Sequence, residues 1–150
     1  MKRLGRIWRA LFPRKPDDAW ALAYLQPEEI SLYLRMDLRD RAHGLEVAQA
    51  LLSRYPEAPE YVIRAALLHD LGKSLRPYRL LERIMTSLYT PPVPVEPLRG
   101  GWVGAWQIRR HHPLYGAQRI KAQDVAALVL EHHAPKSLWA LRIHEIDQEF

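Results

Sequence analysis

The residues of this sequence with the clearest chemical potential are histidines and aspartates. His69 and Asp70 stand side by side at the end of the apolar run Ala65-Ala66-Leu67-Leu68. A buried charge is costly unless it is paired or bound to a metal. Further imidazoles occur at His43, His112, His132 and His133. Cysteine is absent, so these side chains predict a metal site built of nitrogen and oxygen ligands.

The pair His69-Asp70 needs further ligands to complete a metal site. Adjacent helix residues point about 100° apart, so the two side chains share an ion most easily near a helix end. His43 is the natural third ligand, because it lies on the apolar side of the preceding predicted helix. A fourth ligand is expected from the last predicted helix, which offers Asp147 and, one turn earlier on the same face, His144.

A second group consists of His112, His132 and His133. His112 precedes Pro113 and is expected in a loop that leads into a helix, whereas His132 and His133 end another predicted helix. A second metal held by this group, about 3.5–4 Å from the first, would give a two-metal hydrolytic centre. We therefore expect one or two divalent transition metal ions, with manganese, iron, cobalt, nickel and zinc all compatible with the ligands.

The order of these residues resembles the HD superfamily of metal-dependent phosphohydrolases. The resemblance runs from about Leu38 to the C-terminus. It is carried by Asp40-Arg41-Ala42-His43, Ala66-Leu67-Leu68-His69-Asp70-Leu71-Gly72-Lys73, His112-Pro113-Leu114-Tyr115-Gly116-Ala117 and Leu130-Glu131-His132-His133. It implies an all-α fold, an HD-domain bundle of roughly six to eight helices. It also implies a first metal on His43, His69 and Asp70, and a second on His112 with His132 and His133.

The sequence departs from the HD pattern in two places. The superfamily normally closes its site with an aspartate in an Ala-Asp pair on a late helix, and residues 141–147 contain no such pair. Either His144 replaces this acid, or Asp147 takes its role, or the site is weakened. The HD-GYP branch continues after its histidine pair with an acid and Gly-Tyr-Pro, whereas this chain has Ala134-Pro135-Lys136. That branch is therefore not supported.

The resemblance implies an enzyme that hydrolyses a phosphoester or phosphoanhydride bond, with a nucleotide as the expected substrate and a metal-activated water as the nucleophile. Asp70 would bind metal and steer the nucleophile, and Lys73 would approach the substrate phosphate. Arg76 either adds a second positive charge beside Lys73 at the entrance to the site, forming a basic mouth, or is a solvated charge on a helix surface. The alternative function is a catalytically weakened HD module that binds a nucleotide or a partner protein.

Three tryptophans are candidates for stacking on a nucleobase, although large aromatic side chains commonly belong to the core instead. They are Trp102, Trp106 and Trp139.

The positive charge of the chain is concentrated at its N-terminus. Residues 1–16 hold six of the 22 basic side chains and none of the 17 acids, so residues 17–150 are within one charge of neutral. This distribution argues against a nucleic-acid binder with a broad basic face and favours a local anionic contact. We expect a basic arm over residues 1–16 and one helical HD-type domain over residues 17–150.

Residues 1–12 also carry an apolar stripe at helical spacing, formed by Leu4, Ile7, Trp8, Leu11 and Phe12. One interpretation is a short helix that lies on an anionic membrane surface. The other is a surface helix that docks this stripe on the domain. We expect a cytoplasmic protein, peripheral to the membrane under the first interpretation, since we find no signal-peptide pattern and no apolar run that could span a bilayer. The oligomeric state is left open.

Local signals predict helices along most of the chain. Capping residues, prolines and apolar periodicity indicate helices over residues 18–25, from 27, and over 37–54, 59–72, 77–88, 102–110, 113–122, 125–133 and 138–149. Gly72 is a plausible C-terminal glycine and Asp124 a plausible N-cap. The proline-rich residues 90–101 predict a loop, either a lid over the site or a surface connection.

Overall fold

The structure is a computed structural model that describes residues 2–150, without the side chains of Lys2, Arg3, Arg6, Ile7 and Ala10. Nine α-helices and one 3-10 helix occur within residues 2–150, and no strand. They are α1 (Lys2–Leu11), α2 (Asp18–Tyr24), α3 (Pro27–Leu34), α4 (Leu38–Arg54), α5 (Glu60–Leu68), η1 (Leu71–Ser74), α6 (Leu80–Leu88), α7 (Gly101–Ala117), α8 (Gln123–Glu131) and α9 (Leu138–Asp147). The all-α prediction is confirmed, and eight helices follow the N-terminal arm.

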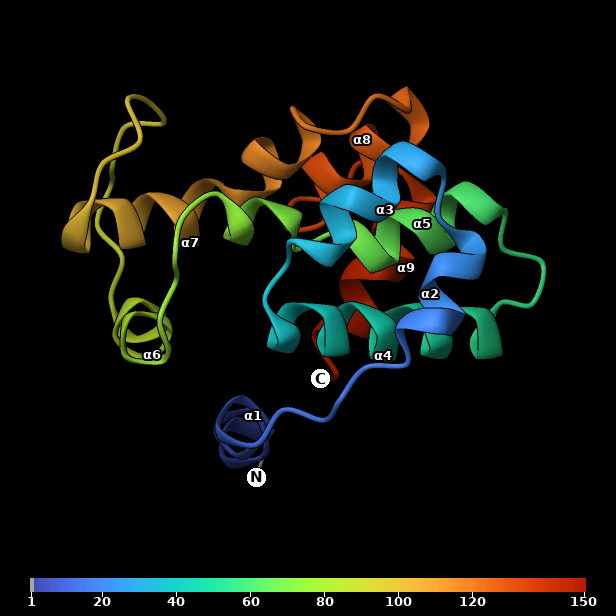
Figure 1. The fold of residues 1–150 in the computed structure, drawn as a ribbon, viewed down its shortest axis with the longest axis horizontal. Helices are drawn as coiled ribbons and strands as arrows, with labels where there is room; N and C mark the ends of the chain where they lie inside the picture. The colour runs from blue at the N-terminus through green and yellow to red at the C-terminus, as the bar shows by residue number, and fades with distance from the viewer. Residues whose placement is uncertain (1) are drawn as a thin grey trace.

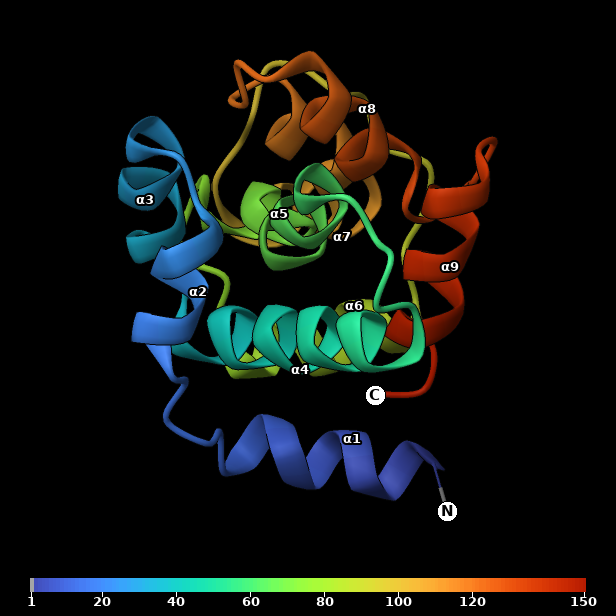
Figure 2. The same cartoon turned by 90° about the vertical axis from the view of Figure 1, so that its right-hand side faces the viewer.

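The helices surround α5, whose residues are almost all apolar. α4, α8 and α2 pack against α5, while α7 packs along η1 and α8, and α9 packs on α4. The core between them is formed by fully buried aliphatic side chains such as Leu51, Ile63, Leu67, Val129 and Ile143. Figures 1 and 2 both show α1 outside this bundle, beyond α4 and near the C-terminus.

Side-chain caps explain why several helices begin where the sequence predicts. The carboxylates of Asp17 and Asp37 accept hydrogen bonds from backbone N–H groups of the first turns of α2 and α4. Ser137 does the same at the start of α9. These bonds satisfy donors that the helix itself leaves unpaired. The predicted starts of α2, α4 and α9 are therefore confirmed.

The structure corrects the prediction that a loop around His112 separates two helices. α7 runs without a break from Gly101 to Ala117 and contains Pro113. Proline has no N–H to donate to the carbonyl of Arg109, four residues earlier. The His112 imidazole compensates, because its Nδ1 lies 3.2 Å from the Arg109 oxygen and 3.0 Å from that of Ile108.

Other predicted boundaries also shift. α5 ends at Leu68 and is followed by the 3-10 turn η1, so Gly72 does not end an α-helix. α6 begins at Leu80 rather than at residue 77. The N-cap of α8 is Ala122 without a side-chain bond, so Asp124 lies inside the helix instead of capping it.

The proline-rich segment between α6 and α7 is held to α7 and lies far from α4 and α5 in Figure 1. The Gln107 amide donates hydrogen bonds to the carbonyls of Pro94 and Pro97 and accepts one from the backbone N–H of Arg99. The Tyr115 hydroxyl donates to the carbonyl of Val95. The segment is thus a surface connection held to α7, rather than a lid over the histidines that are expected to bind metal.

Two glycines allow helices to approach more closely than a side chain would permit. A Cβ atom on Gly44 of α4 would lie 2.7 Å from the carbonyl oxygen of Leu67 in α5. A Cβ atom on Gly72 would lie 2.0 Å from the carbonyl oxygen of His112 in α7. Gly44 directly follows His43, and Gly72 lies two residues after Asp70. The two close contacts therefore also bring these expected site residues toward α5 and α7.

We predict that Gly72→Ala destabilises the fold by about 2 kcal/mol or more, because the new methyl group collides with backbone that cannot move without displacing α7. Thermal unfolding followed by circular dichroism measures the effect. Gly5→Ala is the matched control, since nothing lies within 4 Å of its added Cβ. Equal unfolding temperatures for the two variants would contradict the proposed close packing.

Candidate metal centre

Seven side chains from five parts of the chain converge at one place. His43 comes from α4, His69 and Asp70 follow α5, and His112 comes from α7. His132 and His133 follow α8, and Asp147 ends α9. Neighbouring imidazole rings in this group have centroids 4.2–5.4 Å apart. The structure therefore brings together all the metal ligands expected from the sequence, although their role as ligands stays a proposal.

Backbone hydrogen bonds orient three of the buried histidines. The Nδ1 atoms of His69 and His132 lie 2.7 Å and 2.6 Å from carbonyl oxygens three residues earlier, and that of His112 contacts its own preceding turn. A carbonyl oxygen can only accept, so each Nδ1 carries a proton, and in the neutral form of each ring Nε2 presents a lone pair. This is the tautomer and the orientation that a metal-binding histidine requires.

These three Nε2 atoms provide the test of whether the site fits a metal. Within the described part of the chain, the Nε2 atoms of His69, His112 and His132 are buried and have no hydrogen-bond partner. An unpaired buried polar atom is destabilising, by about 1–3 kcal/mol. Three such atoms beside carboxylates fit a bound cation, which would satisfy all of them.

Asp70 lies between the two halves of the cluster. Its Oδ2 is 3.6 Å from His69 Nε2 and 2.7 Å from Lys73 Nζ, while its Oδ1 is 3.3 Å from His112 Nε2. The two carboxylate oxygens thus face different histidines. This arrangement allows one carboxylate to serve both halves of the site.

The geometry distinguishes the two candidates on the last helix. Asp147 Oδ1 lies 2.7 Å from His43 Nε2 and 3.5 Å from His69 Nε2. His144 instead contacts the backbone carbonyl of His132 through its Nδ1, at 2.7 Å. Asp147 is therefore the side chain that the structure brings to the cluster, and His144 is a neighbour that supports the end of α8.

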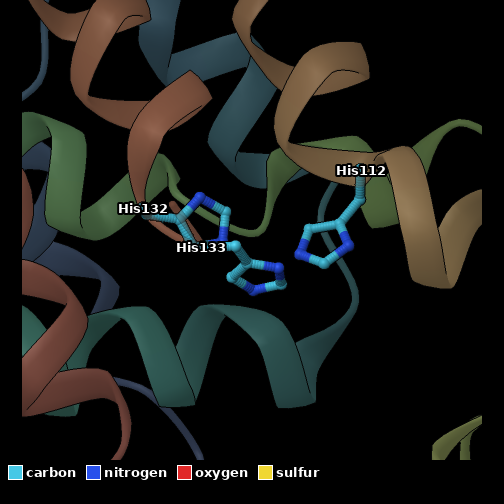
Figure 3. A group of neighbouring side chains, drawn as sticks. All are labelled: His112, His132 and His133. Carbon is cyan, nitrogen blue, oxygen red and sulfur yellow. The ribbon is translucent and has the colours of Figure 1, made fainter. Parts of the chain in front are cut away.

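Three overlapping sets of side chains could each hold an ion. One set is His43, His69 and Asp147, a second is His69, Asp70 and His132, and a third is His112, His132 and His133. Within each set the ligand atoms lie within 4.8 Å of one another. Figure 3 shows the third set, with the ring of His112 on α7 facing the rings of His132 and His133. Because the sets share His69 and His132, the cluster could hold one ion or two.

The electrostatics of the cluster also favour a cation. Burial alone would lower the pKa of His69, but the carboxylates of Asp70 and Asp147 outweigh burial and raise it to about 9. Burial and the neighbouring imidazoles keep the pKa of His132 well below its usual value, and partial burial lowers that of His133 to about 4. A positive charge is thus favoured between the two carboxylates, while the histidines on the other side stay neutral and able to bind metal.

A pocket of about 610 Å³ opens beside the cluster, and its lining includes His43 and Asp70. Lys73 lines this pocket, as the sequence predicts for a residue that approaches substrate phosphate. Arg83 also lines it, but its guanidinium is held by two hydrogen bonds to the buried Asp40. The pocket therefore joins the candidate metal ligands to a basic wall.

Some expected binding residues lie elsewhere. Arg76 is paired with Glu82 at 2.9 Å and lines a separate pocket with Trp102, so it does not extend the basic mouth. Trp106 meets Tyr89 edge to face and Trp139 meets Tyr55 in the same way, so none of the three candidate tryptophans reaches the cluster. Helical periodicity predicts on which face of a helix an aromatic residue lies, but it does not predict which pocket that face borders.

No pattern in the sequence predicts that the N-terminal arm contributes to this pocket. Trp8, Arg9, Phe12 and Arg14 line this pocket together with Arg39 of α4. The arm is far from the histidines in sequence and lies outside the pattern shared with HD proteins. Its only available signals were its charge and its apolar stripe, neither of which indicates where it lies on the domain.

Comparison with family models gives a match to the HD domain over residues 41–148, which includes all seven converging side chains. The chain belongs to the HD domain family. No match was found among curated proteins or among solved structures. HD domain proteins form a superfamily of metal-dependent phosphohydrolases, which agrees with the nitrogen and oxygen donors at the centre of this fold.

We predict that His112→Ala lowers the affinity for a divalent metal by at least the roughly 10–100-fold that loss of an outer-shell partner costs. His111→Ala is the matched control, because the neighbouring imidazole contacts the carbonyl of Val93 instead of the cluster. The metal content of each variant after dialysis against a limiting chelator measures how strongly it retains the ion. Equal metal retention would show that His112 is not a ligand.

We also predict that Asp147→Asn weakens metal binding strongly, because an amide supplies no negative charge to the ion. His144→Gln should leave metal affinity within about threefold of wild type. Isothermal titration of the metal-free variants compares the two. A larger loss for His144→Gln would reassign the closing ligand to the histidine.

Proposed function

We propose that this HD domain protein is a metal-dependent enzyme that hydrolyses a phosphoester or phosphoanhydride bond, with a nucleotide as substrate. The observation that supports this most strongly is the set of buried Nε2 atoms of His69, His112 and His132 beside Asp70, which also lines a pocket with basic side chains. In the proposal, His43, His69, Asp70 and Asp147 hold one ion, and His112, His132 and His133 contribute to a second.

The metal would be a divalent transition ion, because imidazole and carboxylate ligands suit manganese, iron, cobalt, nickel and zinc. When bound, such an ion lowers the pKa of a coordinated water to about 7 and so provides a nucleophile at neutral pH. The side chains of the protein would then have to orient the phosphate and keep the nucleophile in place. Asp70, buried between both halves of the cluster, is suited to steering the nucleophile.

Lys73 would bind a phosphate oxygen of the substrate. Its ammonium lies 2.7 Å from Asp70 Oδ2 and faces the pocket. Burial alone would lower the pKa of Lys73, but Asp70 and Asp40 raise it, so the side chain stays charged. A compact charge of this kind attracts a phosphate group but does not fix the orientation of that phosphate group.

The alternative of a catalytically weakened binding module draws on the departure from the Ala-Asp pair on the last helix and on the basic N-terminal arm. The position of Asp147, 2.7 Å from His43, supports the enzyme over this alternative. We therefore retain the enzyme as the proposed function.

The decisive experiment is a hydrolysis screen of nucleotides and dinucleoside polyphosphates with the metal-free protein, before and after addition of manganese, cobalt, iron, nickel or zinc. We expect release of phosphate or a nucleoside phosphate only when metal is present. Asp70→Asn should abolish turnover. A protein that binds metal but cleaves no substrate in the screen, or an active Asp70→Asn variant, would contradict the proposal.

On any substrate found, Lys73→Ala should raise KM by roughly 10-fold or more with a smaller change in kcat, since a charge-assisted bond to phosphate is lost. Lys136→Ala removes the same charge from an exposed position outside the pocket and serves as control. An unchanged KM for Lys73→Ala would exclude it from phosphate binding.

A further inference from the structure

The N-terminal helix α1 keeps large apolar side chains in water. Leu4 is 74% exposed, Trp8 66%, Phe12 65% and Leu11 42%. Trp8 and Phe12 contact each other edge to face, with ring centroids 4.7 Å apart, and both border the pocket without being buried by the domain. The described side chains of this stripe are therefore exposed rather than packed on the domain, while the side chain of Ile7 lies outside the described residues.

Among the described side chains of α1, Arg9 contacts the C-terminal residue, and Trp8 and Phe12 border the pocket beside α4. The guanidinium of Arg9 lies over the Phe150 ring, 5.4 Å from its centroid. Beyond α1, Pro13 and Pro16 interrupt the helix and lead to α2. Figures 1 and 2 show the ribbon of α1 outside the bundle, on the side of α4. Such a helix can meet a surface larger than the protein itself.

The charge of the arm identifies the kind of surface that fits it. Residues 1–16 carry six basic side chains and no acid. Two copies of α1 would repel each other, so pairing between identical arms is disfavoured. A nucleic acid would satisfy the charge but would leave the exposed leucines and aromatic rings in water. An anionic lipid bilayer satisfies both features, since its headgroups attract the cations and its acyl boundary accepts the apolar side chains.

We propose that α1 docks on an anionic lipid bilayer through Leu4, Trp8, Leu11 and Phe12. The helix would lie in the plane of the interface, and no described helix is long and apolar enough to cross a membrane. Because Trp8 and Phe12 also border the pocket that contains His43, Asp70 and Lys73, docking would place the mouth of that pocket close to the lipid surface.

Vesicle flotation of the full-length protein tests this proposal without any measurement of hydrolysis. We expect binding to vesicles of phosphatidylcholine with phosphatidylglycerol at low salt, and little binding to phosphatidylcholine alone. The double variant Trp8→Ser/Phe12→Ser should bind about tenfold or more weakly, because two aromatic side chains no longer leave water. High salt should also weaken binding.

The matched control is Leu81→Ser/Leu88→Ser on α6, which removes two apolar side chains that are 64% and 74% exposed. This variant should float as wild type does. The proposal is overturned if wild type stays unbound to anionic vesicles, or if the α6 variant loses as much binding as the α1 variant. It is also wrong if the α1 variant floats normally and changes only the KM for a soluble substrate. Absence of phosphohydrolase activity leaves the flotation result intact, so the two proposals fail independently.

Discussion

Hydrogen bonds between imidazole Nδ1 atoms and backbone carbonyls of the preceding turn are the interactions on which this site depends. They hold His69, His112 and His132 in one tautomer, with each Nε2 directed into the cluster. In the other tautomer the same rings would present N–H groups, which cannot bind a metal. Secondary structure thus sets the chemistry, because the accepting carbonyls belong to the helices that carry these histidines.

The second requirement is close approach between backbones. Gly44 brings α4 against α5 next to His43 and His69, and Gly72 brings η1 against α7 next to Asp70 and His112. Side chains as short as imidazole and carboxylate reach one another only if their backbones are this near. The glycines therefore act on the site from outside it, and they link the stability of the bundle to its ligand geometry.

Much of the fold could be predicted from local signals, while the failures have identifiable physical causes. Asp17, Asp37 and Ser137 marked helix starts because capping is a short-range interaction. Pro113 predicted a break that does not occur, since the His112 side chain replaces the missing donor and packing on both sides keeps α7 continuous. The order of the histidines indicated the cluster, but the position of Trp8 beside it depends on tertiary contacts that no local pattern encodes.

The positions of His69 and His132, directly after α5 and α8, affect the order in which ions can bind at the cluster. His69 and His132 are the C-caps of their helices, so the negative ends of two helix dipoles point toward the cluster. This field favours a cation and opposes a bare anion at the same place. A negatively charged molecule such as a phosphate would reach the cluster only after a bound cation has balanced its charge. The metal ion should therefore bind before the anion.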